Sequence, residues 1–360
     1  MKKNRTTNST LRFAIIDIYM ESHIRNGLIY IAIAIVAVGL GCFLTHQYDL
    51  YQTKKIISSI TPLRENNFNY KFIYPLLSYN LNGVSAFLED TTLTGRLNDY
   101  IRTQYQKNNA ESISVYYRDL LNNQWAGVGQ DTQYHPASLM KVAVAMAYYR
   151  LSQLDPLIMQ KALVYASDID KQIKSIGVAS SSTLVLGHSY TVKELIEKTL
   201  EDSDNGADLL LLSHADRKIL NDILIDLNLS TPEKNPDYTI SAKGYSALLR
   251  ILYNATYLTE VDSEDMLSIM GESTYQDGIH AGLPSGTFVA QKFGEYVDVE
   301  APTKKATALE LHNCGVIYAE SHPYQLCIMT KSKGVVDEKQ LASIIKDISG
   351  LVYDYVDSDR

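Results

Sequence analysis

The chain has 360 residues, 46% of them hydrophobic and 21% charged, and this ordinary globular balance argues against a disordered protein. That length is enough for one large domain or two smaller ones with accessory segments. The net charge of -8 argues against a nucleic-acid partner, because phosphate contacts need clustered basic residues and the sequence holds only pairs such as Lys304 and Lys305.

The first predicted element is an uncharged apolar run at residues 28–44, LIYIAIAIVAVGLGCFL. It is just long enough to cross a bilayer as one helix, and lysine and arginine are concentrated before it. The positive-inside rule therefore predicts a single-pass protein of the cell membrane. Its parts are a cytoplasmic N-terminus at residues 1–27, a transmembrane anchor at 28–44, a stalk at 45–70 and an extracytoplasmic domain at 71–360.

Three other interpretations of the apolar run stay open. A cleaved signal peptide would need an A-x-A-like cleavage site, which the run lacks. Lipoprotein processing would use Cys42, although the run remains apolar past that cysteine. The third alternative is a buried helix of a soluble protein.

The predicted domain opens with an amphipathic helix at residues 92–108 and a strand at 112–118, which returns through a turn into a second strand at 125–128. A helix that is apolar on every side follows at residues 141–149, which is typical of a buried helix. Residues 155–280 have a mostly helical pattern, and Thr191-Val-Lys-Glu194 is a capping box that opens one of these helices.

Strand character returns at residues 287–293, 312–319 and 325–331, and a final helix at 337–357 carries apolar residues on one face. This order predicts an α+β fold, with an antiparallel sheet of about five strands covered by the terminal helices. An all-helical lobe, at about residues 150–280, is inserted in the α/β part.

Three cysteines are present, and none has the spacing of zinc ligands, so we expect no metal site and no cofactor. Cys314 and Cys327 flank a predicted hairpin turn, which makes them near neighbours. Because disulfide geometry is restrictive, we expect two unlinked, buried strand residues, with their redox state open.

Lys141 is the only amine in an otherwise apolar stretch, residues 139–149. Burying a lysine costs several kcal/mol unless it is paired or neutral, and burial lowers the pKa of its ammonium, which makes a neutral amine available as a base. Ser138 lies three residues earlier on the same helical face, just behind Pro136. At a helix N-terminus its backbone N–H can help to hold an oxyanion. The pattern predicts a nucleophile with its own base.

Two further motifs follow in a fixed order. A Ser-Asp-Asn triplet at residues 203–205 opens a helical stretch, and a Lys-Phe-Gly triplet at 292–294 falls on a predicted strand. Ser-x-x-Lys, Ser-Asp-Asn and Lys-Thr-Gly, in this order, form the active-site signature of class A β-lactamases and penicillin-binding proteins. Here Phe293 stands in place of the usual threonine.

With these three motifs the chain resembles the class A β-lactamase-like serine hydrolases. The resemblance extends to residues 135–141, 187–195 and 281–284 and covers roughly residues 95–357. It implies that Ser138 attacks a carbonyl and becomes acylated while Lys141 takes its proton.

The resemblance also implies roles for the other motif residues. Ser203 would relay a proton to the leaving nitrogen, Asn205 would hydrogen-bond the amide side chain of the substrate, and Lys292 would supply positive potential for a substrate carboxylate. Gly294 would let the substrate backbone approach the strand edge, and the backbone N–H of Glu295 would be the second oxyanion donor. We expect Asp204 to be a structural turn residue.

Two departures from the family pattern matter. Phe293 replaces a hydroxyl residue that helps to bind the substrate carboxylate, so that contact is weakened or reshaped. The glutamate that activates the deacylating water in class A β-lactamases is not recognisable in residues 229–239, where Glu233 is the only candidate. The expected consequence is an acyl-enzyme that hydrolyses slowly.

These observations predict a membrane-anchored, extracytoplasmic serine hydrolase with a monomeric catalytic domain. It would form an acyl-enzyme at Ser138 with β-lactams and/or D-Ala-terminated peptidoglycan stem peptides. A true class A β-lactamase is one alternative. An inactive cell-wall binding or sensor module is another, favoured by Phe293 and the missing glutamate but opposed by the otherwise intact motif residues.

Overall fold

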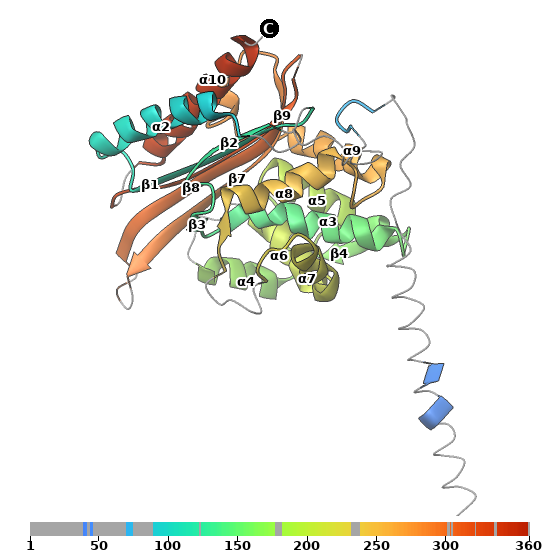
Figure 1. Ribbon diagram of the computed structural model, residues 1–360. Coiled ribbons are helices and arrows are strands. Elements are labelled where there is room, and N and C mark those ends of the chain that lie inside the picture. The colour runs from blue at the N-terminus through green and yellow to red at the C-terminus, as the bar shows by residue number, and fades with distance from the viewer. Residues whose placement is uncertain are drawn as a thin grey trace, which may run out of the picture. The chain divides into compact units, whose positions relative to one another are not determined.

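The computed structural model divides the chain into two units, Met1–Leu63 and Arg64–Arg360 (Figure 1). The structure describes residues 39–41, 44–45, 70–74, 89–121, 124–176, 182–231, 238–300, 303, 305–320, 322–334 and 337–358. Within these residues, no helix combines the length and the apolar character needed to cross a membrane. The anchor predicted at residues 28–44 and the stalk predicted at 45–70 lie almost wholly outside the described residues.

The second unit is built on a five-stranded antiparallel sheet in the order β2-β1-β9-β8-β7. Its strands are β1 (Ser112–Asp119), β2 (Trp125–Val128), β7 (Phe288–Glu300), β8 (Lys305–Tyr318) and β9 (Tyr324–Lys331). The predicted sheet is thus confirmed, although β7 and β8 extend several residues further as a long hairpin. The order of the strands makes β7 an edge strand, which leaves one side of its backbone free to line a site.

Helices cover both faces of this sheet (Figure 1). The helices α2 (Thr91–Gln106) and α10 (Glu338–Ser358) pack on one face, where Leu97 and Ile345 are fully buried. The helical lobe packs on the other face. Because both faces are covered, β1 is buried along nearly its whole length and shows no alternation of buried and exposed residues.

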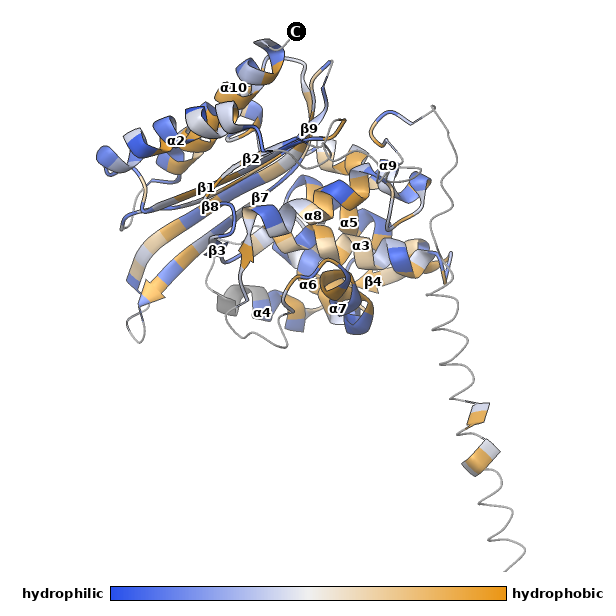
Figure 2. Ribbon diagram, in the orientation of Figure 1, coloured by the Kyte–Doolittle hydropathy of each residue, from blue (hydrophilic) through white to orange (hydrophobic). Residues whose placement is uncertain are grey.

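The lobe surrounds one central helix, α3 (Lys141–Ser152), in which every residue from Lys141 to Tyr149 is buried, as predicted. Figure 2 shows many hydrophobic residues along α3 and along α8 (Ala242–Tyr253), with hydrophilic ones between them. The other helices are α4 (Ser167–Ile176), α5 (Val192–Glu201), α6 (Asn205–His214), α7 (Arg217–Asp226), α8 (Ala242–Tyr253) and α9 (Glu260–Gly271). Two short strand pairs join β3 (Gln133–Tyr134) to β6 (Ile240–Ser241) and β4 (Ala162–Val164) to β5 (Ser189–Thr191).

Two local expectations have opposite outcomes. The predicted capping box is confirmed, because Thr191 and Glu194 each bond the other's backbone N–H at the start of α5. The expectation of two unlinked cysteines is wrong, since Cys314 and Cys327 form a disulfide. They lie directly opposite each other in the β8–β9 register, and that pairing cannot be obtained from their sequence spacing.

Candidate active site

Ser138 lies in a short 3-10 helix, Ala137–Met140, that leads directly into α3. The preceding residue, Ala137, has a φ of 48°, in the left-handed region that an alanine rarely adopts. Strained residues of this kind persist only where the surrounding structure holds them, and they cluster at functional sites. The turn therefore fixes the half-buried Ser138 at the N-terminal end of α3.

The Lys141 side chain extends from the first residue of α3 toward the Ser-Asp-Asn segment. Its Nζ donates hydrogen bonds to the Ser203 carbonyl (2.5 Å), to Ser203 Oγ (3.2 Å) and to Asn205 Oδ1 (2.7 Å). The residue is only 3% exposed. Burial lowers the pKa of its ammonium to about 8, while the charges of Asp208 and Asp204 partly restore it. About a tenth of the amine is thus neutral at pH 7, far more than for an ordinary lysine, and the neutral form is the one that a general base requires.

Ser203 receives hydrogen bonds from two lysines at once. Its Oγ accepts from Lys141 and also from Lys292 Nζ, at 2.8 Å. Because both lysines donate to Ser203 Oγ, the hydroxyl proton of Ser203 does not point at either lysine. It can be directed at another acceptor, which a residue that passes a proton to a leaving group requires. Ser203 also has a positive φ, of 56°, so both hydroxyl residues of the site are held by strained backbone.

Lys292 is fully buried on β7, next to the site. Besides Ser203, its Nζ contacts the Phe293 carbonyl at 3.2 Å and lies 4.4 Å from the centre of the Phe293 ring. Burial, together with the nearby Lys141 ammonium, holds the pKa of Lys292 well below its usual range, against the opposing charge of Asp208. The side chain of Lys292 thus makes its contacts with Ser203 and Phe293, inside the protein.

One predicted contact is missing from this structure. Ser138 Oγ makes no hydrogen bond to Lys141 Nζ, which is turned toward Ser203 and Asn205. Catalytic hydrogen bonds are often long in unliganded enzymes and tighten only when substrate binds. The role of Lys141 as the base for Ser138 stays a prediction.

Asp208 is a site residue that the sequence reasoning missed. It lies in the first turn of α6, three residues after Asn205, and its Oδ1 is buried with no hydrogen-bond partner in the part of the chain that the structure describes. Burial raises the pKa of Asp208 to about 6, although the charges of Lys141 and Lys292 lower it. The available signal in the sequence was an acidic residue on the same helical face as Asn205, followed directly by four leucines.

Asp204 has the structural role expected of it. Its side chain caps α6 by accepting from the Ala207 N–H at 2.9 Å, and it also accepts from the Thr183 hydroxyl. Asn205 follows as the first residue of α6, with its Oδ1 engaged by Lys141. Its amide nitrogen is the group that would face a substrate, which no contact in the structure tests.

Gly294 is required by a close approach within the protein. A Cβ at this position would lie 2.9 Å from the Pro136 carbonyl oxygen and 3.2 Å from the Leu139 nitrogen. The edge strand β7 thus runs directly beside the segment that carries Ser138. Glu295 is the next residue on the strand and is exposed, but its predicted oxyanion role is not tested by any contact.

Phe293 stacks on Tyr275, with ring centres 4.1 Å apart and planes inclined by 14°. Across the β7–β8 pair, Phe293 faces Asn313, whose amide is already engaged by the Ile279 N–H at 2.8 Å and the Lys292 carbonyl at 3.3 Å. An aromatic pair thus occupies the position where the family pattern has a hydroxyl.

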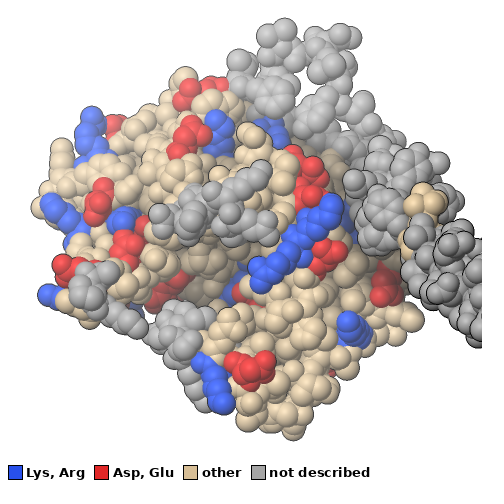
Figure 3. Space-filling model, turned by 90° about the horizontal axis from the view of Figure 1, so that it is seen from below, with Lys and Arg blue, Asp and Glu red and all other residues tan. Residues whose placement is uncertain are grey.

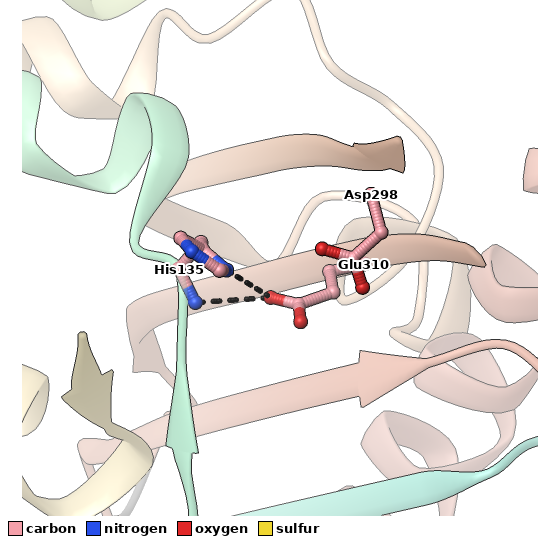
Figure 4. Close-up of side chains that lie close together, drawn as sticks. All are labelled: His135, Asp298 and Glu310. Carbon is pink, nitrogen blue, oxygen red and sulfur yellow. Dashed lines mark hydrogen bonds and ion pairs between the residues drawn. The ribbon is translucent and has the colours of Figure 1, made fainter. Parts of the chain in front are cut away.

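Figure 4 shows a polar cluster of His135, Asp298 and Glu310, whose first member lies three residues before Ser138 in the chain. The buried Glu310 accepts a hydrogen bond from the His135 backbone N–H at 3.0 Å, and His312 Nε2 contacts the His135 carbonyl, also at 3.0 Å. Both side chains belong to β8, and their hydrogen bonds hold the backbone of His135, which precedes the strained turn at Ala137. We interpret them as positioning residues for Ser138.

The same cluster contains a possible metal-ligand set, formed by His135, Asp298 and Glu310. However, Lys331 Nζ lies 2.5 Å from Asp298 and 3.4 Å from Glu310. Its ammonium already supplies the positive charge that the two carboxylates need, so we interpret the cluster as an ion-pair network.

The candidate for a deacylating base, Glu233, lies outside the described residues, which stop at 231 and resume at 238. Within the described part of the site, no carboxylate makes a hydrogen bond to Ser138 or Lys141.

Comparison with known proteins agrees with this geometry. The model of the Beta-lactamase enzyme family matches residues 93–356. This chain belongs to that family. It is therefore a serine hydrolase, and the suspected resemblance is confirmed. No curated protein is similar enough in sequence to count as a match.

Several solved structures share the fold at low sequence identity. A mutant of PBP-A, solved as an acyl-enzyme complex with penicillin G, is 18% identical with a TM-score of 0.60, covering 75% of this chain and 98% of its own. A class A β-lactamase from Mycobacterium abscessus is 20% identical with a TM-score of 0.59, covering 73% and 99%. A β-lactamase from Chitinophaga pinensis is 17% identical with a TM-score of 0.60, covering 74% and 99%. At these identities the likeness concerns the fold alone.

The face drawn in Figure 3 has acidic and basic side chains interspersed, and neither sign forms a continuous patch there. This face offers no extended basic surface for a nucleic acid.

Proposed function

We propose that this protein is an acyl-serine enzyme that attacks an amide or β-lactam carbonyl with Ser138 and releases the acyl group slowly. The observation that carries the proposal is the hydrogen-bonded chain from Lys141 through Ser203 to Lys292, placed beside the strained turn that holds Ser138. This chain can take a proton from the nucleophile and return it to a leaving group. Candidate substrates are β-lactams and/or D-Ala-terminated peptidoglycan stem peptides.

Slow deacylation is proposed because a water molecule needs a base within hydrogen-bond reach. The described carboxylate most strongly coupled to the site is Asp208, and it interacts electrostatically with both lysines without a hydrogen bond to either. The negative charge of Asp208 raises the pKa of both lysines. It does not provide a base poised over the acyl-serine.

We further propose a single-pass membrane protein with its catalytic domain outside the cytoplasm. The apolar run at residues 28–44, with basic residues before it, supports this topology. The Cys314–Cys327 disulfide also supports it, because disulfides persist mainly in oxidising compartments. Protease protection of a C-terminal epitope in sealed inside-out vesicles would test this topology, and cleavage there would contradict it.

Intact mass spectrometry tests the chemistry. The full chain in detergent micelles is incubated with penicillin G, and the mass is followed over time. A lasting adduct that is absent in Ser138→Ala but present in Ser213→Ala, an exposed serine on α6, supports the proposal. Rapid loss of the antibiotic without a lasting adduct favours the true class A β-lactamase. No adduct and no turnover favour the inactive binding or sensor module.

A further inference from the structure

The Phe293–Tyr275 stack lies beside Lys292 and, through it, next to Ser203. Ser203 is the residue placed to give a proton to the leaving group, and Lys292 bonds Ser203 Oγ while its ammonium lies over the Phe293 ring. The part of a substrate beyond the scissile bond must therefore pass close to Phe293. Both stacked residues are half-buried, so they present a wall to that part of the ligand.

The surroundings of this wall are acidic. Asp277, Glu295 and Glu338 all act electrostatically on the Tyr275 hydroxyl, and the charges of Asp277 and Glu295 raise the pKa of Glu338 in addition to its burial. These carboxylates come from three separate segments: the loop before β7, the edge strand β7 and the first turn of α10. No lysine or arginine in the described residues forms an ion pair with any of them.

The lysine beside Phe293 is already engaged within the protein. Lys292 is fully buried and uses its ammonium on Ser203 and Phe293. The cross-strand neighbour of Phe293 is Asn313, an uncharged residue whose amide is already engaged on both sides. A free carboxylate bound here would meet three like charges, while the Lys292 ammonium is already engaged inside the protein.

The Tyr275 hydroxyl gives a separate indication that something binds at the wall. It is buried and has no hydrogen-bond partner among the described residues, which is costly unless a ligand satisfies it. Burial and the surrounding carboxylates raise its pKa, so it keeps its proton and remains a donor. An amide or ester carbonyl can accept a hydrogen bond from this hydroxyl without bringing another negative charge next to the three carboxylates.

We infer that the substrate carries an uncharged or cationic group, and not a free carboxylate, on the leaving side of the bond that Ser138 attacks. This inference rests on the proposed function and narrows it, because it disfavours D-Ala-terminated stem peptides, whose leaving residue carries a free carboxylate. Among peptides it favours those whose chain continues past the scissile bond or ends in an amide. It predicts that the carboxylate of a penicillin contributes little to binding.

A matched set of thioesters tests this inference. All three carry the same N-acyl-D-alanyl group, and the leaving thiols are mercaptoacetate, mercaptoacetamide and thiocholine. Ser138 Oγ bonds to the carbonyl carbon, the C–S bond breaks, and the Ser138 proton leaves with the thiol, so the acyl-enzyme is identical in each case. Thiol release gives the second-order acylation rate, which is divided by the rate of attack by hydroxide on the same ester.

We expect the amide and thiocholine esters to acylate the full chain at least about tenfold faster than the carboxylate ester. Phe293→Thr should reduce the amide-to-carboxylate ratio, and Glu338→Gln should reduce the thiocholine-to-amide ratio. Glu300→Gln, an exposed carboxylate at the far end of β7, should leave both ratios as in the wild type.

The outcomes separate the two proposals. A carboxylate ester that reacts as fast as the other two, or faster, overturns this inference and leaves the acyl-serine function standing. If none of the three esters acylates Ser138, the proposed function fails and the inference with it. Because the wild-type ratio is decisive, the test does not depend on whether Phe293→Thr folds.

Discussion

The protonation of Lys141 gives the most direct test of the site. Burial lowers the pKa of this ammonium to about 8, and only the neutral amine can accept the Ser138 proton. The neutral fraction is then about 1% at pH 6, about half at pH 8 and about 90% at pH 9. Acylation should therefore accelerate about 50-fold between pH 6 and pH 8, and only about twofold more by pH 9.

Asp208→Asn tests the electrostatic part of this argument. The negative charge of Asp208 is the larger of the two that raise the pKa of Lys141, so its removal favours the neutral amine. We expect the midpoint of the pH profile to move below 8, with faster acylation at pH 6 than in the wild type. Asp168→Asn, an exposed acid on α4, makes the same change in net charge and should leave the midpoint unmoved.

The assay is the acylation rate with the mercaptoacetamide thioester, measured by thiol release from pH 5.5 to 9.5 and corrected for hydrolysis without enzyme. A midpoint in Asp208→Asn that stays at the wild-type pH or rises would refute the electrostatic argument. Lys141→Ala that acylates at the wild-type rate would refute the assignment of Lys141 as the base.

Three other variants probe the scaffold. Gly294→Ala places a Cβ 2.9 Å from the Pro136 carbonyl oxygen, so β7 or the nucleophile segment must shift, and acylation should slow about 10- to 100-fold; an unchanged rate would mean that the fit is loose. Glu310→Gln weakens the grip on His135, and urea unfolding should show a loss of about 1–3 kcal/mol together with slower acylation; a loss of stability alone would argue against a positioning role. Ile345→Ala leaves a cavity between α10 and the sheet and should cost about 2–5 kcal/mol in urea unfolding without slowing acylation by the folded protein.

Much of the fold could be predicted because its signals are local. The buried helix α3 is apolar on every side, and the capping box of α5 satisfies its own backbone donors within four residues. The three catalytic motifs were likewise predictable, since each is a short run of residues on one element. What links them, such as the Lys292–Ser203 hydrogen bond, follows from the family resemblance and not from any spacing.

The missed features all depend on contacts between distant segments. Cys314 and Cys327 are linked because of the register of β8 on β9, which hydrophobic patterning does not fix to one residue when both faces of a strand are buried. Asp208 looked like an ordinary acidic residue in the first turn of a helix, a position that the helix dipole favours in any protein. Only the burial of two lysines beside it gives that carboxylate a role.

The two residues with strained backbone lie in the two segments that the proposed acylation of Ser138 depends on. Ala137 and Ser203 both have positive φ, and each adjoins a segment held by buried polar groups. Glu310 and His312 hydrogen-bond the backbone of His135 and so hold the turn at Ala137. Lys141 donates a hydrogen bond to the backbone carbonyl of Ser203. Strain of this kind would relax if those contacts were weak, so the contacts must exceed its cost of about 1–3 kcal/mol per residue. Every one of these contacts orients the nucleophile or the proton relay, which is the arrangement that the proposed acylation of Ser138 requires.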